Sequence, residues 1–347
     1  MSISDTSLPS ENCSIDISTY ASLTIHGLGS SEENPAKITL SRSQSFPAPR
    51  LIRRYVAVPR NESWAPLSLP NCGAQLELEL TDKISEGRVG LAYGARVINN
   101  TAADLSLPDL CIKLVKPKYG RTLAREAWFY EQLARQPGYE GVVTPRCFGF
   151  FTVSLKDCLD VKGRPVSRIM PWENIKFGPL RQDSDSTDIQ DEDRDGWLPD
   201  DPPGLEKYFK DEDDWKSGSS WDKWRSSSSD PLICILVLER LGKHYSCKTI
   251  RGGEKQSKRQ EVELDDMRDL VRDLCAIGIS QSDLRTPNIV RATSDVICPR
   301  HKRAHRWRVI DFDIAAKVHV SPETARDIKY VGLEVEVIGG PYFWGWL

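Results

Sequence analysis

Three oxygen-bearing side chains in the carboxy-terminal half of the sequence have types and spacings suited to metal binding and to chemistry on a hydroxyl group. Asp283 precedes Asn288 by five positions on one loop, and Asp311 follows at the end of a predicted strand. A carboxylate and a carboxamide on one loop can address a substrate hydroxyl and a Mg²⁺ ion from adjoining points. Asp311 adds a hard oxygen ligand for the same ion, which would bridge phosphate oxygens. The spacing therefore predicts phosphoryl-transfer chemistry.

The elements that must position these residues follow from the apolar pattern. Apolar side chains recur at intervals of three and four between Leu264 and Cys275, which predicts an amphipathic helix that ends at Gly278. A polar loop leads from this helix to a short strand at residues 289–290. A second strand at 305–310 ends at Asp311. A helix followed by this hairpin makes a chance occurrence of the Asp283–Asn288 spacing much less plausible.

A lysine and a glutamate earlier in the chain form a second candidate pair. Lys113 lies in the strand-like segment 110–115, and Glu126 lies in a predicted helix over 122–136. A buried lysine near phosphates needs a counter-charge, and a helix beside the sheet can supply one. Glu131 is an alternative partner. The competing interpretation is an exposed strand lysine and an unrelated glutamate on the helix surface.

Strand signals surround this pair in an order that favours antiparallel pairing. They occur at residues 74–81, 91–97, 110–115, 142–153 and 233–239, with one helix after the third. This order lacks the regular alternation of a parallel α/β sheet. Shorter strand-like pieces at 22–26, 36–40 and 51–58 lie in a segment, residues 1–73, to which we assign no function.

The order and spacing of these motifs resemble the protein kinase superfamily, in particular fungal kinase-like proteins with the metal motif Asp311-Phe312-Asp313. The resemblance covers residues 74–340. It implies an α+β fold of two lobes, the first rich in β-strands and the second reduced and mainly helical. It also implies Mg²⁺-ATP-dependent phosphoryl transfer to a hydroxyl acceptor, foremost that of a protein serine or threonine.

The resemblance also assigns roles to individual residues. Lys113 would hold the α and β phosphates of ATP, Glu126 would orient Lys113, and Asp283 would orient or deprotonate the acceptor hydroxyl. Asn288 and Asp311 would hold Mg²⁺. The remaining assignments concern the nucleotide and its phosphates: Gly87, Gly90 and Ala92 in the loop over the phosphates, the backbone near Glu239 and Leu241 for adenine, and Arg285 as a cation for phosphate.

Departures from the family pattern keep two other functions open. Gln281-Ser282 stands where most kinases have His-Arg, and Asp313 replaces the glycine of the metal motif. These changes, with a short carboxy-terminal part, favour a pseudokinase that binds nucleotide as a scaffold. A small-molecule phosphotransferase is the second alternative, since such enzymes share the Asp-x-x-x-x-Asn spacing and need no peptide groove. By the same resemblance, Asp327, Gly332 and Glu336 belong to a buried helix behind the catalytic loop.

Composition limits the partners and the compartment. The net charge of −3 gives no overall bias toward nucleic acid or a membrane surface, and no apolar run is long enough to cross a membrane. Nine scattered cysteines and the absence of a signal-like amino terminus predict an intracellular protein, cytoplasmic or nuclear. Residues 181–230 hold 16 acidic against 7 basic side chains and predict a flexible insertion that could also bind a protein partner.

Two smaller groups of residues complete the sequence picture. Cys298, His301 and His305 have a spacing that could seat a metal ion, but no fourth ligand is apparent in the sequence. The basic residues around them favour a surface loop. The last seven residues, 341–347, form an aromatic tail. Four tryptophans in the acidic insertion would either fasten it to the body of the protein or bind a partner.

Overall fold

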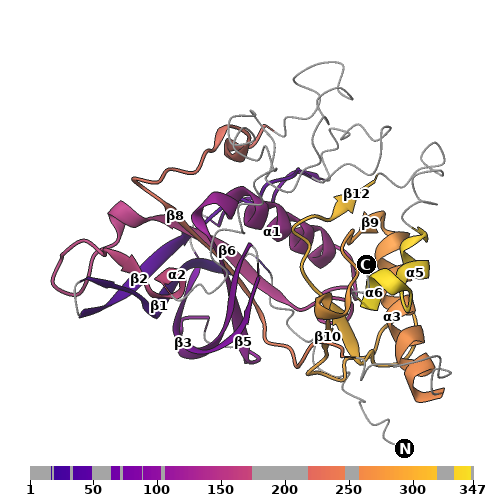
Figure 1. The fold of residues 1–347 in the computed structure, drawn as a ribbon. Helices are drawn as coiled ribbons and strands as arrows, with labels where there is room; N and C mark the ends of the chain where they lie inside the picture. The colour runs from indigo at the N-terminus through magenta and orange to yellow at the C-terminus, as the bar shows by residue number, and fades with distance from the viewer. Residues whose placement is uncertain are drawn as a thin grey trace, which may run out of the picture.

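The main feature of the computed structural model is a β-sheet that closes on itself (Figure 1). Its strands follow the order β2-β6-β8-β5-β4-β3-β1-β7, and the antiparallel pairing of β1 with β2 joins seven of them into a closed barrel. The strands are β1 Tyr20–Ser31, β2 Asn34–Arg42, β3 Ala74–Glu86, β4 Gly90–Asn100, β5 Leu110–Val115, β6 Cys147–Ser154, β7 Arg168–Ile169 and β8 Leu232–Glu239. The structure describes residues 17, 19–31, 34–48, 64–70, 73–87, 89–102, 106–173, 218–246, 258–318 and 332–344.

The alternation of side chains along each strand separates the inside of the barrel from its outer face. On β5, the side chains of Leu110, Ile112 and Leu114 join the apolar cluster inside the barrel. Lys113 lies between them in the sequence, so its side chain points to the outer face, opposite Leu236 of β8. Leu236 belongs to a second apolar cluster, which contains the buried side of α1. The strand period therefore directs Lys113 toward α1.

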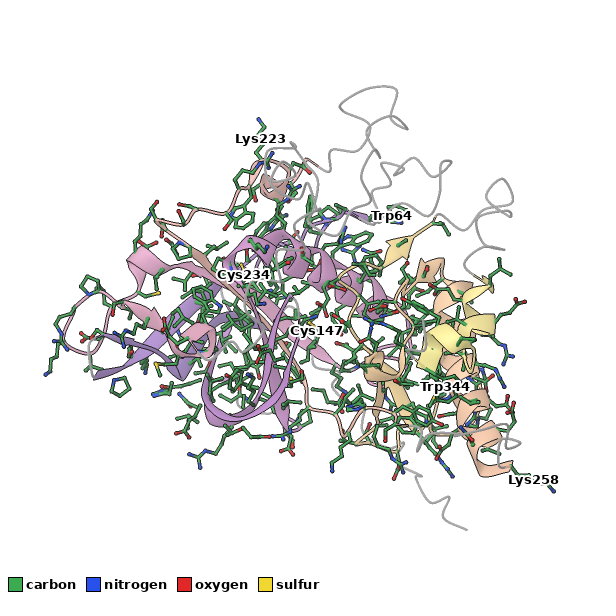
Figure 2. All side chains as sticks on the ribbon, viewed as in Figure 1. Trp64, Cys147, Lys223, Cys234, Lys258 and Trp344 are labelled. Carbon is green, nitrogen blue, oxygen red and sulfur yellow. The ribbon has the colours of Figure 1, made fainter. Side chains whose placement is uncertain are left out.

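Helix α1, Gly120–Ala134, packs against β6 and β8 on this outer face. Cys147 of β6 and Cys234 of β8, which Figure 2 labels, belong to the apolar cluster that contains the buried side of α1. All but the last of the helix's residues are buried, among them the acidic side chain of Glu126. Charged groups rarely have this degree of burial without a partner, so the helix must meet opposite charges there.

The remaining described elements lie beside the barrel and complete the fold (Figure 1). Two short strand pairs, β10 with β11 and β9 with β12, connect the longest helix to the barrel side of the molecule. These elements are α2 Met170–Glu173, α3 Lys258–Ala276, β9 Ile279–Ser280, β10 Ile289–Arg291, β11 Trp307–Val309, β12 Ala316–Lys317, α5 Glu334–Val337 and α6 Pro341–Trp344.

The expectation of a bilobal kinase-like fold with a mainly helical second lobe is wrong. The structure is mostly β, and its described residues contain five α-helices, of which three have only four residues. Two physical reasons account for the difference. The strands at 20–42, set apart in the sequence from the segment beginning at residue 74, close the barrel by pairing with β3 and β6. Beyond α3, the described residues form short strand pairs and single helical turns and not packed long helices.

The described end of the acidic insertion is fastened to the body of the protein. Trp221 is buried, and its indole nitrogen donates a 2.6 Å hydrogen bond to the carbonyl of Gln44. Trp224 packs beside it with a ring separation of 5.4 Å. Trp197 and Trp215 lie outside the described residues. Two of the four tryptophans therefore pack against the fold.

The described helices include none with the length and apolar character needed to cross a membrane.

Candidate active site

Lys113 lies at the centre of a cluster of carboxylates between the barrel and α1. Its ammonium nitrogen is 2.5 Å from Oε2 of Glu126 and 2.6 Å from Oδ1 of Asp311. Glu126 is buried on α1, and Asp311 follows β11, so three separate elements converge on one cation. Glu131, the alternative partner for Lys113, instead accepts hydrogen bonds from Ser45 and the backbone of Leu67.

The charges in this cluster do not balance. Burial opposes the cationic form of Lys113, but Asp311, Glu126 and Asp313 outweigh it and raise the pKa of Lys113. The same burial raises the pKa of Glu126 to about 7, against the opposing effect of Lys113. One ammonium thus faces three carboxyl groups in a partly buried space. With all three ionised, and with the buried guanidinium of Arg125 beside Asp313, the cluster carries one surplus negative charge, which a divalent cation would offset.

The hairpin of β10 and β11 brings Asn288 and Asp311 to one end of the cluster. Ile289 pairs with Val309, and the amide of Ile310 donates to the carbonyl of Asn288 at 3.0 Å. Asp311 adopts a φ of 68°, a left-handed conformation that is uncommon outside glycine. Asp311 therefore adopts a costly backbone conformation, and its carboxylate lies against Lys113.

Helix α1 fixes the segment after Asp311. Phe312 is fully buried against the rings of Phe129 and Tyr130. The buried guanidinium of Arg125 donates through Nε to the carbonyl of Asp313 at 2.8 Å. The metal motif of the sequence is thus anchored to the helix that carries Glu126.

Asp283 accepts hydrogen bonds from three side chains. Nδ2 of Asn288 lies 3.1 Å from its Oδ2, and a guanidinium nitrogen of Arg285 lies 2.6 Å from the same oxygen. The hydroxyl of Tyr342, on α6, donates to the other oxygen, Oδ1, at 2.7 Å. Both oxygens of Asp283 therefore have donors, and one donor is itself a hydroxyl.

Gln281 connects the loop of Asp283 to the strand of Asp311. Its amide nitrogen donates to the carbonyls of Ile310 and Asp311, at 3.1 and 2.8 Å. Its amide oxygen accepts from the backbone N–H of Asp283 at 2.7 Å. A fully buried glutamine with both ends engaged holds two chain segments at a set separation. Gln281 differs from the kinase pattern in the sequence, and in the structure it directly links the segments of Asp283 and Asp311.

Glu334 on α5 supports the same loop from behind. Its carboxylate accepts from the backbone N–H of Gln281 at 3.0 Å and of Ser282 at 2.8 Å, and from the hydroxyl of Ser280. Burial raises the pKa of Glu334. Ser282 has a φ of 65°, so these bonds hold a left-handed residue immediately before Asp283. The resemblance places Asp327 and Glu336 in a buried helix behind this loop, but Glu336 is exposed and Asp327 lies outside the described residues.

Gly87, in the turn between β3 and β4, and Gly90, the first residue of β4, have different roles. The N–H of Gly87 donates to the carbonyl of Gly90 at 2.8 Å, which closes the turn. At Gly90 an added Cβ would lie 2.3 Å from the carbonyl oxygen of Leu114, whereas Gly87 has room for one. Gly90 is therefore required by close strand packing. Ala92 pairs with Lys113 across the sheet, so its small side chain lies beside the lysine on the outer face.

Glu239 and Leu241 lie at the end of β8. The backbone N–H of Glu239 donates to the carbonyl of Arg146 at 2.8 Å, so this amide is not free for a ligand. A shallow hollow lies nearby, with His244, Arg291 and Trp307 in its wall. None of the residues in the cluster around Lys113 lines this hollow. We therefore place the candidate site at Lys113 and not in this hollow.

Asp311 and Asn288 are the residues of this site that could hold a metal ion. Asp311 and Asn288 offer carboxylate and carboxamide oxygens, the ligand types that Mg²⁺ prefers, in a cluster with surplus negative charge. The structure brings together Lys113, Glu126 and Asp311 by direct contact, and Asp283, Asn288 and Arg285 by another set of contacts. Gln281 joins the two sets.

A comparison with protein-family models found no match to the chain, and a comparison with curated proteins found none either.

Proposed function

We propose that the protein transfers a phosphoryl group from Mg²⁺-ATP to a hydroxyl acceptor, foremost a serine or threonine of a protein. The observation that supports this most is the position of Lys113, held between Glu126 and Asp311 at hydrogen-bond distance from both. A fixed cation beside a cluster with surplus negative charge suits a polyphosphate that arrives with its own divalent ion. The proposal rests on this site and on the order of the motifs.

The side chains around Lys113 would divide the binding of the nucleotide. Lys113 would donate to phosphate oxygens, and Glu126 would keep the ammonium in place while the nucleotide exchanges. Asp311 and Asn288 would hold the magnesium ion, which when bound neutralises charge on the phosphates and positions them. Binding would require the ammonium of Lys113 to share its contact with Asp311, because that carboxylate would also serve the metal.

Asp283 would receive the acceptor. Its Oδ1 accepts a hydrogen bond from the hydroxyl of Tyr342, which is the kind of contact that an acceptor hydroxyl would make. A carboxylate at this place would orient the acceptor and take its proton as the new bond to phosphorus forms. Arg285, which contacts the other oxygen, would stay near the transferred group as a cation.

One observation favours a second function, nucleotide binding without turnover. Asp283 is engaged by Arg285, Asn288 and Tyr342 together, so an acceptor must displace one of them. A chain in which Tyr342 never leaves would bind Mg²⁺-ATP and act as a scaffold. A third function, transfer to a small molecule, shares the whole site and differs only in the acceptor.

Two measurements on the full chain test these functions. Thermal stability with ATP, with and without Mg²⁺, reports binding, and phosphate transfer from labelled ATP to a protein substrate or to a panel of small hydroxyl compounds reports turnover. We expect a metal-dependent rise in melting temperature and transfer to protein. Lys113→Met should abolish the stabilisation by ATP, and Asp283→Ala should abolish transfer while binding persists.

The matched control for Lys113→Met is Lys118→Met, which removes an exposed lysine that contacts neither carboxylate. Stabilisation without any transfer would support the scaffold. Transfer to a metabolite but not to protein would support the small-molecule enzyme. Equal responses to ATP in the wild type, Lys113→Met and Lys118→Met would refute the proposed site.

A further inference from the structure

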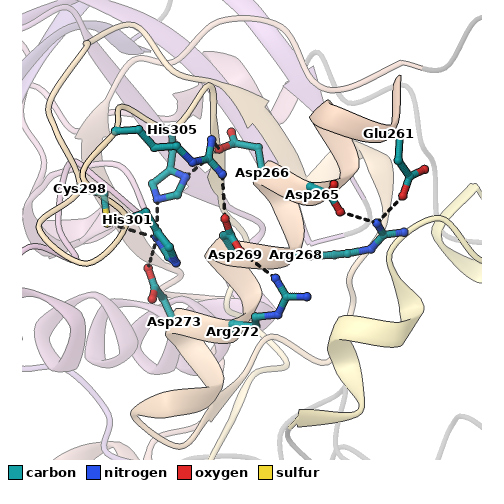
Figure 3. A network of polar contacts seen from close by, with 11 residues as sticks. Glu261, Asp265, Asp266, Arg268, Asp269, Arg272, Asp273, Cys298, His301 and His305 are labelled. Atoms are coloured by element: carbon teal, nitrogen blue, oxygen red, sulfur yellow. Dashed lines mark hydrogen bonds and ion pairs between the residues drawn. The ribbon is translucent and has the colours of Figure 1, made fainter. Parts of the chain in front are cut away.

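A second cluster of chemically active side chains lies away from Lys113, where the chain between β10 and β11 meets α3. Asp273 extends from α3, and Cys298, His301 and His305 extend from the connection (Figure 3). One ligand atom from each of the four residues can be chosen so that all four lie within 4.8 Å of one another. Asp273 is the fourth ligand that the sequence did not reveal.

The separations within the cluster match those of ligands around one small ion. Nδ1 of His301 lies 3.1 Å from Nε2 of His305, 3.5 Å from Sγ of Cys298 and 3.6 Å from Oδ2 of Asp273. Around a tetrahedral zinc ion with bonds of about 2.0 Å to nitrogen and about 2.3 Å to sulfur, two nitrogens are about 3.3 Å apart and nitrogen and sulfur about 3.5 Å apart. A zinc ion therefore fits between these atoms with small adjustments.

A buried carboxylate fixes which nitrogen of His305 faces the cluster. Nδ1 of His305 lies 2.8 Å from Oδ1 of Asp266, a residue two helical turns before Asp273 on α3. Since the carboxylate accepts, Nδ1 carries the proton, and Nε2 presents a lone pair toward His301. Asp266 is held in turn by the backbone N–H of Arg306 and by the guanidinium of Arg303. A histidine that donates to a carboxylate in this way is typical of metal ligands.

Hydrogen bonds alone satisfy this cluster poorly. With Nε2 of His305 acting as an acceptor, the thiol of Cys298 adds one weak donor and Nδ1 of His301 can offer at most one proton. That proton would face three neighbours, Nε2, Sγ of Cys298 and the carboxylate of Asp273. Cys298 and His305 are fully or almost fully buried, so water offers little compensation. A cation among the four atoms would use every lone pair at once.

Asp273 has a further partner that is compatible with a role as ligand. Nε of Arg300 lies 2.9 Å from its Oδ2, and the guanidinium of Arg300 stacks on the ring of Tyr139 at 4.0 Å. The backbone carbonyl of Asp273 accepts from the hydroxyl of Tyr139 at 3.1 Å. The ion pair with Arg300 would balance part of the charge of the carboxylate.

We propose that Asp273, Cys298, His301 and His305 form a structural zinc site. One thiolate, two imidazoles and one carboxylate are a donor set that selects zinc, and four protein ligands leave no open position for chemistry. The ion would fasten the β10–β11 connection to α3. Since Asn288 and Asp311 stand at the base of the same hairpin, the zinc site would also steady the candidate active site. The proposal does not depend on the proposed function.

The test is metal analysis of the full chain purified without chelators, followed by removal of the metal and reconstitution with zinc alone or cobalt alone. We expect about one zinc ion per chain. The cobalt form should show the visible absorption of tetrahedral Co²⁺ and a thiolate-to-cobalt charge-transfer band. Removal of the metal should lower the melting temperature by at least about 3 °C.

Two variants and two controls complete the test. Cys298→Ser should remove the thiolate band, and His301→Ala, at the most exposed of the four ligands, should lower zinc content severalfold in a chain that still folds. Cys158→Ser, at another buried cysteine, and His244→Ala, at an exposed histidine, should leave zinc content unchanged.

Three results would overturn the zinc site. They are zinc content at trace level both before and after reconstitution, full zinc content in His301→Ala, and stoichiometric occupancy by a metal other than zinc in the purified chain.

Discussion

Replacing Tyr342 by phenylalanine is expected to increase phosphoryl transfer, because it removes a competitor for the candidate catalytic carboxylate. The hydroxyl of Tyr342 donates to Oδ1 of Asp283 at 2.7 Å, the atom that would otherwise receive the acceptor. Burial and then this hydrogen bond raise the pKa of Tyr342 to about 12. The phenol therefore stays protonated at working pH, and release of Asp283 requires movement of the Tyr342 side chain or of α6.

The magnitude follows from the strength of this one bond. A hydrogen bond to a charged group contributes about 1.5–3 kcal/mol. Tyr342 is 40% exposed, so the low end of that interval applies. A difference of about 1.4 kcal/mol is a tenfold change in an equilibrium. The Tyr342→Phe variant keeps the ring and loses only the hydroxyl, so kcat/KM should rise about tenfold while ATP binding stays the same.

The assay compares the initial rates of phosphate transfer of the wild type, Tyr342→Phe and Trp344→Phe at equal ATP. Trp344 lies on the same short helix and donates from its indole to Gly339, but the described contacts of its ring are with Tyr245 and Phe343. Trp344→Phe loosens α6 without removing the hydroxyl at Asp283. Equal rates in Tyr342→Phe and the wild type would refute competition by Tyr342, and equal gains in both variants would assign the effect to mobility of the helix.

Three further changes have expected outcomes. Burial, with a smaller effect of Arg135, lowers the pKa of Lys317 from 10.5 to about 8. Between pH 8 and pH 10.5 the folded chain therefore binds fewer protons than the unfolded chain, and the free energy of unfolding rises with pH. Lys317→Met should therefore raise the free energy of unfolding at pH 7 by at most about 3 kcal/mol, because the variant also loses the hydrogen bond to the carbonyl of Ile277. The gain should be gone by about pH 10.5, and an equal gain at both pH values in urea unfolding would contradict this prediction. Gln281→Leu leaves buried groups of both active-site segments without partners, so urea unfolding should show a loss of about 2–4 kcal/mol, together with a loss of transfer. Wild-type transfer rates in Gln281→Leu would argue against the link. Gly90→Ala places a Cβ 2.3 Å from the carbonyl oxygen of Leu114 and should lower the melting temperature by several degrees. Gly87→Ala, where a Cβ has room, should leave the melting temperature unchanged. A larger loss in Gly87→Ala than in Gly90→Ala would contradict the role of close strand packing at Gly90.

Local patterns in the sequence predicted the individual elements well. The segment 110–115 is a strand with the predicted bounds, and the helix predicted over 122–136 spans Gly120–Ala134. The period-2 and period-3.6 patterns of these segments arise from burial on one face, which is a local property. The prediction that Lys113 lies on a strand and Glu126 on the following helix is confirmed, and the structure brings the two side chains into contact.

The closed barrel could not be predicted, because its closure depends on pairing between distant segments. The pieces at 22–26 and 36–40 read as strands, but nothing local shows that β1 runs parallel to β3 or that β2 pairs with β6. The resemblance to kinases gave no place to these strands. Closure of a sheet is decided by twist and register over the whole ring, which individual strand patterns do not encode.

The residues missed at both sites are those contributed by distant elements. Glu334 and Tyr342 reach the Asp283 loop from single helical turns that have no apolar periodicity of their own. The sequence did contain a pattern from which the role of Asp273 could have been predicted. Asp266, Asp269 and Asp273 share one face of α3, at spacings of three and four residues, and a basic segment with two histidines is the natural counterpart of such a face.

The position of β8 constrains how a newly synthesised chain can mature. This strand is the last of the ring to leave the ribosome, yet it lies between β5 and β6, and its residues from Ile233 to Val237 have no exposed surface. Until it emerges, β5 and β6 each keep one row of backbone groups unsatisfied and a strongly apolar flank uncovered. Such intermediates associate readily and mature slowly. Production of the chain should therefore depend on chaperones during translation.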